Sequence, residues 1–176
     1  MYKKLSERGV ILEMSQLYDR LNKILLEINL VFNDNIDIEN HRDDYENWIP
    51  FEFKLKLENE EEYILTKNGC ETFNIQELKY MISGFESIIN SKKEKKLVEE
   101  FSFESIERHF SIKVYDTYEE DSFNIDLWLI ISKFNNLETY GYEKGFKYVV
   151  LLDSFIKFVL GLKEELQKIL NATVAK

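Results

Sequence analysis

This 176-residue chain has few of the residues that most often build catalytic and metal centres. It contains one cysteine, Cys70, and two histidines, His41 and His109. One cysteine cannot form an intramolecular disulfide or supply a cysteine-based metal site. Nucleophilic catalysis would need a serine or cysteine beside a histidine that a carboxylate orients, and neither histidine stands in such a pattern. We therefore expect no metal and no cofactor.

Long apolar runs are also absent. Near the N-terminus, Lys3 and Lys4 precede an apolar run that extends only from Val10 to Leu12. A signal peptide needs a longer apolar core, and a membrane-spanning helix needs about 20 apolar residues. We expect a cytoplasmic protein without a membrane contact. The abundance of Ile, Asn, Lys and Phe beside a single proline favours an AT-rich, bacterial coding genome.

No motif of a known catalytic loop occurs, since G-x-S-x-G, the P-loop and G-x-G-x-x-G are all missing. The acidic segment Asn33–Asp37 is similar to the start of a calcium loop, but Ile38 stands at the sixth position, where the sharp turn needs glycine. Glu119, Glu120 and Asp121 could supply paired carboxylates for acid–base chemistry. Three adjacent acids in a turn point in divergent directions, so we expect that the chain is not an enzyme. An enzyme with an unrecognised carboxylate site is the weaker alternative.

Negative charge is the most informative excess in the sequence. The chain has 33 acidic and 23 basic side chains, a formal net charge of −10 and a pI near 4.8. This balance argues against nucleic acid as a partner and favours a basic protein. The surplus is clustered, because residues 34–62 hold eleven acids and three bases, and residues 99–126 hold nine acids and two bases.

Both acidic segments also contain aromatic residues, among them Tyr45, Trp48, Tyr115 and Tyr118, and Trp128 follows the second segment closely. Carboxylates steer a basic partner toward a surface, and Tyr or Trp side chains often anchor the interface. The alternative is that these charges only solvate an acidic domain. We predict that the following residues bind the partner: Asp43, Asp44, Tyr45, Glu46, Tyr115, Tyr118, Glu119, Glu120 and Asp121.

Apolar residues at helical spacing predict two to three amphipathic helices that face the core. The first covers about residues 14–31, with an apolar stripe from Leu17 to Ile28. The second begins at Asn74 as its N-cap, where Glu77 completes a capping box. The third begins after Asp153 or Ser154.

Between the helices the apolar period changes to two, as in half-buried strands. The clearest example is Phe51–Glu58, where Phe and Leu alternate with Glu and Lys. Consecutive strands with short connections favour an antiparallel meander of about five to seven strands, and therefore an α+β fold. We expect a single domain over residues 1–176, with its sheet-and-helix body at about 47–171.

One detail does not fit a simple two-layer arrangement. Trp128 and Ile130 lie on the face of their strand opposite the core residues, and so do Val149 and Leu151. That face is covered by the first helix, by a partner or by a second copy of the chain. We favour the helix, and a homodimer through the sheet face near Trp128 is the alternative.

Four stretches of the sequence, taken together, resemble a bacterial protein family. In chain order they are Trp48–Phe53, Asn74–Leu78, Phe110–Asp116 and Tyr140–Phe146. At these spacings, roughly residues 45–170 resemble the immunity proteins encoded beside WapA-type, contact-dependent toxins of polymorphic toxin systems. The shared features are hydrophobic patterns.

The resemblance implies a small cytoplasmic protein that binds and inactivates a cognate toxin domain, often a nuclease. Such toxin domains are commonly basic because they bind nucleic acid, which agrees with the acidic charge of this chain. The resemblance supplies no contact residues, because such families diversify at the interface. A phage or mobile-element inhibitor, or a DNA mimic, is the alternative binding class.

Overall fold

The structure is a computed structural model that describes residues 15–33, 36–65, 71–134 and 142–174. These residues form nine strands, two α-helices and two 3-10 helices. In chain order the elements are β1 (Gln16–Tyr18), β2 (Ile24–Leu30), η1 (Asp44–Glu46), β3 (Trp48–Leu57), β4 (Glu62–Leu65), β5 (Thr72–Asn74), α1 (Ile75–Lys93), β6 (Phe101–Glu104), β7 (Phe110–Asp116), β8 (Ser122–Ile130), η3 (Ile131–Lys133), β9 (Glu143–Leu151) and α2 (Leu152–Val174).

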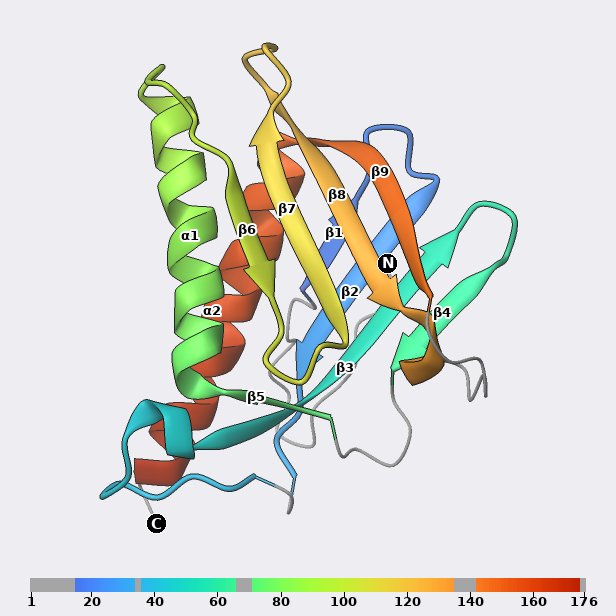
Figure 1. Ribbon diagram of the computed structural model, residues 1–176. Helices are drawn as coiled ribbons and strands as arrows, with labels where there is room; N and C mark the ends of the chain where they lie inside the picture. Colours follow the sequence, from blue (N-terminus) through green and yellow to red (C-terminus); the bar gives the residue numbers. More distant parts are fainter. Residues whose placement is uncertain (1–14, 34–35, 66–70, 135–141, 175–176) are drawn as a thin grey trace, which may run out of the picture.

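The strands form two antiparallel sheets (Figure 1). The order in the first sheet is β1-β2-β3-β4, and β5 pairs with the N-terminal end of β3. The order in the second sheet is β6-β7-β8-β9. The predicted α+β class is confirmed. The single meander of five to seven strands is corrected to two sheets, with nine strands in the described residues.

Strand β3 shows how the alternating sequence produces its structure. Phe51, Phe53 and Leu55 are buried, whereas Lys54 is half-buried and Lys56 is exposed on the opposite face. Because successive side chains of a strand point to opposite faces, this pattern places one face on the core and the other in solvent. The predicted strand is therefore confirmed.

The predicted N-terminal helix at about 14–31 is wrong, because its described residues form β1, β2 and the turn between them. The carboxylate of Asp19 accepts hydrogen bonds from the backbone N–H groups of Lys23 (2.5 Å) and Ile24 (2.8 Å), and this interaction closes the turn. Leu21, counted in the helical stripe, lies in the turn and is 67% exposed. The buried residues instead follow the period of a strand: Leu17, Leu26 and Ile28.

The other two predicted helices are confirmed. Helix α1 begins with the expected capping box, in which the Asn74 side chain accepts from Glu77 N (2.7 Å) and the Glu77 carboxylate accepts from Asn74 N (3.1 Å). A Cβ at Gly84 would lie 2.2 Å from the Phe101 ring, so β6 approaches α1 at a position without a side chain. Helix α2 begins at Leu152, slightly earlier than predicted.

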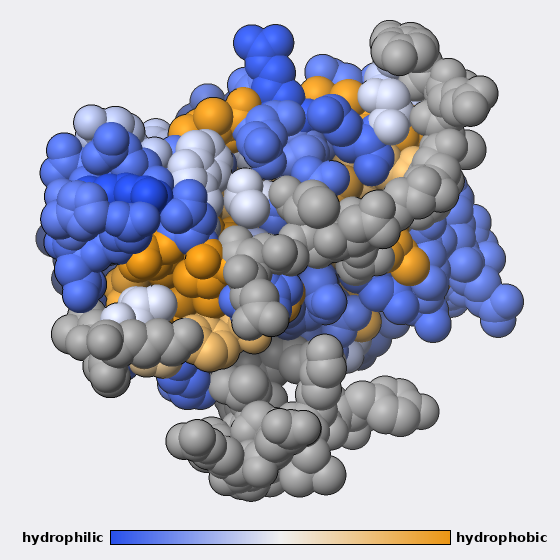
Figure 2. Space-filling model, turned by 90° about the horizontal axis from the view of Figure 1, so that it is seen from below, coloured by the Kyte–Doolittle hydropathy of each residue, from blue (hydrophilic) through white to orange (hydrophobic). Residues whose placement is uncertain are grey.

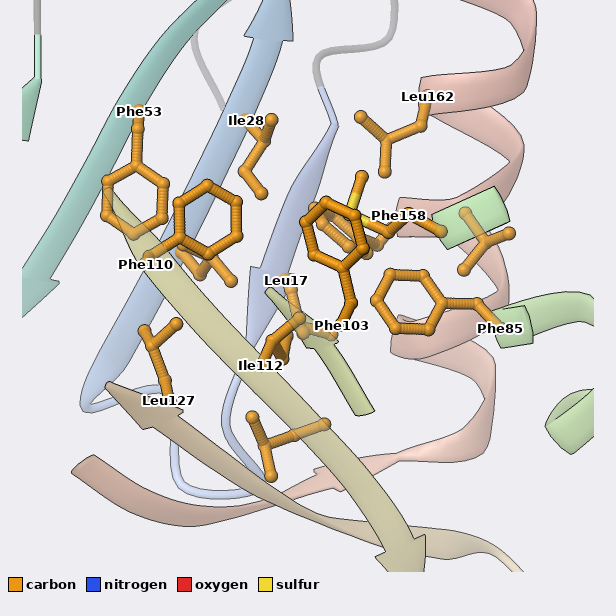
Figure 3. Packing of buried hydrophobic residues seen from close by; sticks show 14 of the residues in the cluster. Leu17, Ile28, Phe53, Phe85, Phe103, Phe110, Ile112, Leu127, Phe158 and Leu162 are labelled. Atoms are coloured by element: carbon orange, nitrogen blue, oxygen red, sulfur yellow. The ribbon is translucent and has the colours of Figure 1, made fainter. Parts of the chain in front are cut away.

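The two sheets and the two helices enclose one hydrophobic core (Figures 1 and 3). The sheets meet at Phe53 and Phe110, whose ring centroids lie 4.9 Å apart. The helices meet at Phe85 and Phe155, with centroids 5.2 Å apart. Phe51 stacks on Phe73 within the first sheet. In the described part of the chain, neither α1 nor α2 is long and apolar enough to span a membrane.

Candidate partner-binding surfaces

The predicted binding residues lie mainly at the two ends of α1 (Figure 1). At its first turns, Lys79 Nζ lies 2.6 Å from Asp44 Oδ2 of η1. At its C-terminal end, Lys92 pairs with Asp116, and Lys95 Nζ lies 3.0 Å from Glu120 Oε1 in the β7–β8 turn. At 1.5 Å per residue, Lys79 and Lys92 are about 20 Å apart along the helix. The candidates therefore form two separate sites.

The first site, which we name the η1 surface, consists of Asp43, Asp44, Tyr45 and Glu46. Tyr45 is 54% exposed, and the carboxylate of Glu46 accepts a hydrogen bond from Asp43 N (3.2 Å). Figure 2 views this end of the molecule and shows hydrophilic residues gathered on the side of η1 and α1, next to a hydrophobic strip. An exposed aromatic ring and several carboxylates are therefore neighbours here, as the sequence predicts.

A residue that the sequence analysis did not select, Asn47, gives the η1 surface its shape. Its buried side chain accepts from Glu39 N (2.9 Å) and donates to the carbonyl groups of Arg42 and Asp43 (3.3 Å each). These bonds close the loop before β3. The only available sequence signal was an asparagine directly before a strand, which is common in turns.

The η1 surface keeps an excess of negative charge. Arg42 binds Asp37 (2.7 Å) and Glu39, and the bond to Asp37 raises the pKa of its guanidinium. Lys79 pairs with Asp44. Residues 36–46 contain five acids and one arginine, Arg42. Even with Lys79 of α1 added, carboxylates outnumber the basic side chains. His41 is exposed and its Nε2 lies 3.3 Å from Glu39, which agrees with a solvated role.

The second site is a cleft of about 380 Å³ at the C-terminal end of α1, which we name the α1–β7 cleft. Tyr118 stands at the tip of the β7–β8 turn with a positive φ of 65° and is 98% exposed. Three of the predicted residues line the cleft together with a group that the prediction did not include. The full lining is Lys92, Lys93, Lys95, Lys96, Val98, Asp116, Tyr118, Glu119, Glu120 and Leu152.

The carboxylates of the α1–β7 cleft are already paired with cations of this chain. Lys92, whose side chain is only 7% exposed, binds Asp116 and lowers the pKa of its carboxyl. Arg20 binds Glu119 and lowers its pKa in the same way. With four lysines and three acids in its lining, the cleft is not a negative patch. The run from Lys92 to Lys96 was visible in the sequence, but only as the end of a helix.

The remaining predicted residues, Asp121 and Tyr115, lie apart from the cleft lining. Asp121 Oδ1 is 3.5 Å from Arg20, which also binds Glu119, whereas Glu120 pairs with Lys95, so the three carboxylates are divided between two cations of this chain. Tyr115 lies on the outer face of the second sheet, where its hydroxyl donates to Asp126 (3.1 Å). Residues 34 and 35 of the acidic segment at 33–37 lie outside the described residues.

The outer face of the second sheet carries Trp128, which is 41% exposed and packs over Gly145. The expected cover by an N-terminal helix is wrong, because those residues belong to the first sheet. Charged groups interrupt the apolar surface, since Lys147 pairs with Asp126 (2.9 Å) beside Trp128 on β8. A homodimer through this face stays a prediction.

Comparison with known proteins adds no assignment, because no protein-family model and no curated protein matches the chain. The function must therefore be inferred from the surfaces described above and from the resemblance in the sequence.

Proposed function

We propose that this protein binds a basic toxin domain and neutralises it by covering the toxin's working surface, as a cytoplasmic immunity protein. The observation that carries the proposal is the η1 surface, where half-exposed Tyr45 stands among Asp43, Asp44 and Glu46. A basic domain would meet both a local negative field and an aromatic side chain able to enter a pocket.

The η1 surface is suited to binding because it is held in place before a partner arrives. Asn47 fixes the loop from within, and Lys79 holds Asp44 against α1. A surface that is ordered in advance loses less conformational entropy on association. Binding energy can then go into the contact with the partner.

A protein partner is favoured over DNA mimicry by the spacing of the charges. A DNA mimic should present carboxylates in a continuous array, because duplex DNA carries a charge about every 1.7 Å along its axis. In the described residues, the predicted carboxylates divide between the two ends of α1, and the four lysines of the cleft interrupt the negative surface at one end. This arrangement fits a compact docking site better.

The test uses the toxin domain encoded beside this gene, purified and assayed for its own activity with and without the protein. An equimolar amount of wild-type protein should abolish the activity. Tyr45→Ala should raise the dissociation rate about 30-fold, which corresponds to about 2 kcal/mol for an anchor residue. The matched control is Tyr118→Ala, since Tyr118 is also an exposed tyrosine but stands beside lysines that repel a basic domain.

Two results would contradict the proposal. Full toxin activity in the presence of excess protein would overturn the neutralising function. Neutralisation that depends on Tyr118 and not on Tyr45 would keep the function but overturn the assignment of the η1 surface.

A further inference from the structure

A separate cluster of metal-binding side chains lies where the two sheets meet. Glu71 directly precedes β5 in the first sheet, whereas Glu107 and His109 lie in the β6–β7 turn of the second. His109 Nε2 is 2.8 Å from Glu71 Oε2 and 3.1 Å from Glu107 Oε2. One ligand atom from each of the three residues lies within 4.8 Å of the other two. The cluster shares no residue with the surfaces proposed to bind the partner.

The imidazole of His109 is held at this point by packing and by its backbone. Its side chain is 2% exposed and its ring packs edge-on to Phe51, with centroids 6.2 Å apart. The hydroxyl of Ser105 accepts a hydrogen bond from His109 N (2.8 Å). Nδ1 is buried and has no hydrogen-bond partner among the described residues. The polar interactions of the ring therefore depend on what occupies the space at Nε2.

The two carboxylates are also positioned by the fold. Glu107 Oε2 accepts a hydrogen bond from Thr72 N (3.4 Å), which links the β6–β7 turn to β5. Glu77 fixes the same turn from α1, since its carboxylate accepts from Ile106 N (3.0 Å). The ligands therefore lie on two parts of the chain, the residue before β5 and the β6–β7 turn, and α1 fixes the turn through Glu77.

Two carboxylates converge on one buried ring nitrogen, and a cation at this point would be attracted to both of them. An N–H at Nε2 would give one proton to two acceptor oxygens, so it satisfies only one of them well. We propose that the cluster binds a divalent transition metal ion, with His109 Nε2 and one oxygen each of Glu71 and Glu107 as its ligands. The mixture of one imidazole and two carboxylates suits Zn²⁺, which binds more tightly than Mn²⁺ at such sites.

The two distances from His109 to the carboxylates are already close to those of a zinc site. Zn–N and Zn–O bonds of about 2.0 to 2.2 Å place neighbouring tetrahedral ligands about 3.3 Å apart. The present separations of 2.8 and 3.1 Å therefore have to open by a few tenths of an ångström. Glu71 and Glu107 can make this adjustment, because their side chains are 25% and 39% exposed. That exposure also gives the ion a path from solvent and leaves room for water as a fourth ligand.

A bound ion would join the two sheets through their own side chains. Neither sheet contains the complete ligand set, so binding would stabilise the native packing relative to the unfolded chain. The sequence analysis expected no metal because the chain has one cysteine, two histidines outside any ligand pattern and no valid calcium loop. Glu71 lies far from His109 in the chain, so no sequence motif connects them. Only the contact between the sheets brings the three ligands together.

The experiment titrates Zn²⁺ into the full chain after removal of metals with EDTA and desalting. Calorimetry should give one site, and a 100-fold excess over Kd should raise the melting temperature by about 5 °C or more. Co²⁺ in place of Zn²⁺ should give visible absorption bands typical of a four-coordinate ion. Glu71→Gln and Glu107→Gln should each weaken Zn²⁺ binding at least about tenfold. Glu104→Gln, an exposed acid near the same turn, is the matched control and should bind as wild type.

Glu71 and Glu107 are substituted in preference to the buried His109, because their side chains are partly exposed and the variants should still fold. Circular dichroism of the metal-free variants checks that they are folded. Absence of Zn²⁺ binding by the wild-type protein would overturn the proposal. Equal affinity in wild type, Glu71→Gln and Glu107→Gln would overturn it as well, because the ion would then bind elsewhere.

Discussion

The segments that pack at the two ends of α1 are η1 and the β7–β8 turn. Their sequences are similarly acidic and aromatic, but the surfaces that they form differ. The η1 surface and the loop before it (residues 36–46) hold five acids against Arg42 and Lys79, and Tyr45 is half-exposed on the η1 surface. At the α1–β7 cleft, Lys92, Lys95 and Arg20 pair with the carboxylates around Tyr118. A count of acids along the chain therefore does not give the charge of a surface, because the neutralising residues arrive from other elements.

The largest expected effect concerns the helix that both surfaces share. Phe85, in the middle of α1, is fully buried and contacts Phe155 and Phe101. Phe85→Ala should lower the free energy of unfolding by about 3 to 4 kcal/mol, because it leaves a cavity between the helices. Urea denaturation measures the loss. The control Ser87→Ala, on the exposed side of α1, should stay within about 0.5 kcal/mol of wild type.

The buried carboxyl of Glu165 should make stability depend on pH in the opposite direction to the paired acids of the cleft. Glu165 on α2 is 8% exposed, and it accepts hydrogen bonds from Leu30 N (2.7 Å) and Ser15 Oγ (3.2 Å). Burial raises its pKa from 4.5 to about 7. The native state therefore keeps this proton at pH values where the unfolded chain has lost it. Stability should fall as the pH rises from 4.5 to 7, by an amount on the order of 3 kcal/mol.

Glu165→Gln tests this assignment, because glutamine stays neutral at every pH. The variant should be about 2 to 3 kcal/mol more stable than wild type at pH 8 and about equal to it at pH 4. Chemical denaturation across this range gives both values. A constant difference between the two proteins at all pH values would show that Glu165 does not titrate in the native state as described.

A smaller difference in stability is expected between substitutions of the two lysines that pair with acids at the ends of α1. Lys92 is almost buried beside Asp116, whereas Lys79 and Asp44 are about half-exposed. Lys92→Met should cost about 1 to 2 kcal/mol at pH 7, and Lys79→Met less than about 0.5 kcal/mol. The pairing lowers the pKa of Asp116, so its stabilisation is present above the ordinary pKa of the carboxyl and is lost as the pH falls through the lowered value. Similar losses for both variants at neutral pH would remove the contrast.

Much of the fold could be predicted from local patterns, and the errors have identifiable causes. The alternation in β3 and the capping box of Asn74 and Glu77 depend on near neighbours, and both are confirmed. The stripe from Leu17 to Ile28 fits a helical period by coincidence. The turn that breaks it depends on Asp19 accepting backbone hydrogen bonds, which the apolar pattern does not reveal.

The candidate surfaces were harder to predict because their charges are set by tertiary contacts. Arg20 and Glu119 are 99 positions apart, and Lys92 and Asp116 are 24 apart. No periodicity connects such residues, so the sequence located the acids but not their partners. The cluster of Glu71, Glu107 and His109 was missed for the same reason.

The central claim is that a basic toxin domain approaches the η1 surface and not the α1–β7 cleft. Two charge-reversed variants compare the surfaces directly: Asp43→Lys with Asp44→Lys, and Glu119→Lys with Glu120→Lys. Their association rates with the toxin domain should be measured by stopped flow at about 0.05 and 0.3 M salt, where screening differs strongly. The account predicts that the first variant associates at least about tenfold more slowly at low salt and loses most of its salt dependence, while the second stays within about twofold of wild type. Equal slowing of both variants, or slowing of the second alone, would contradict it.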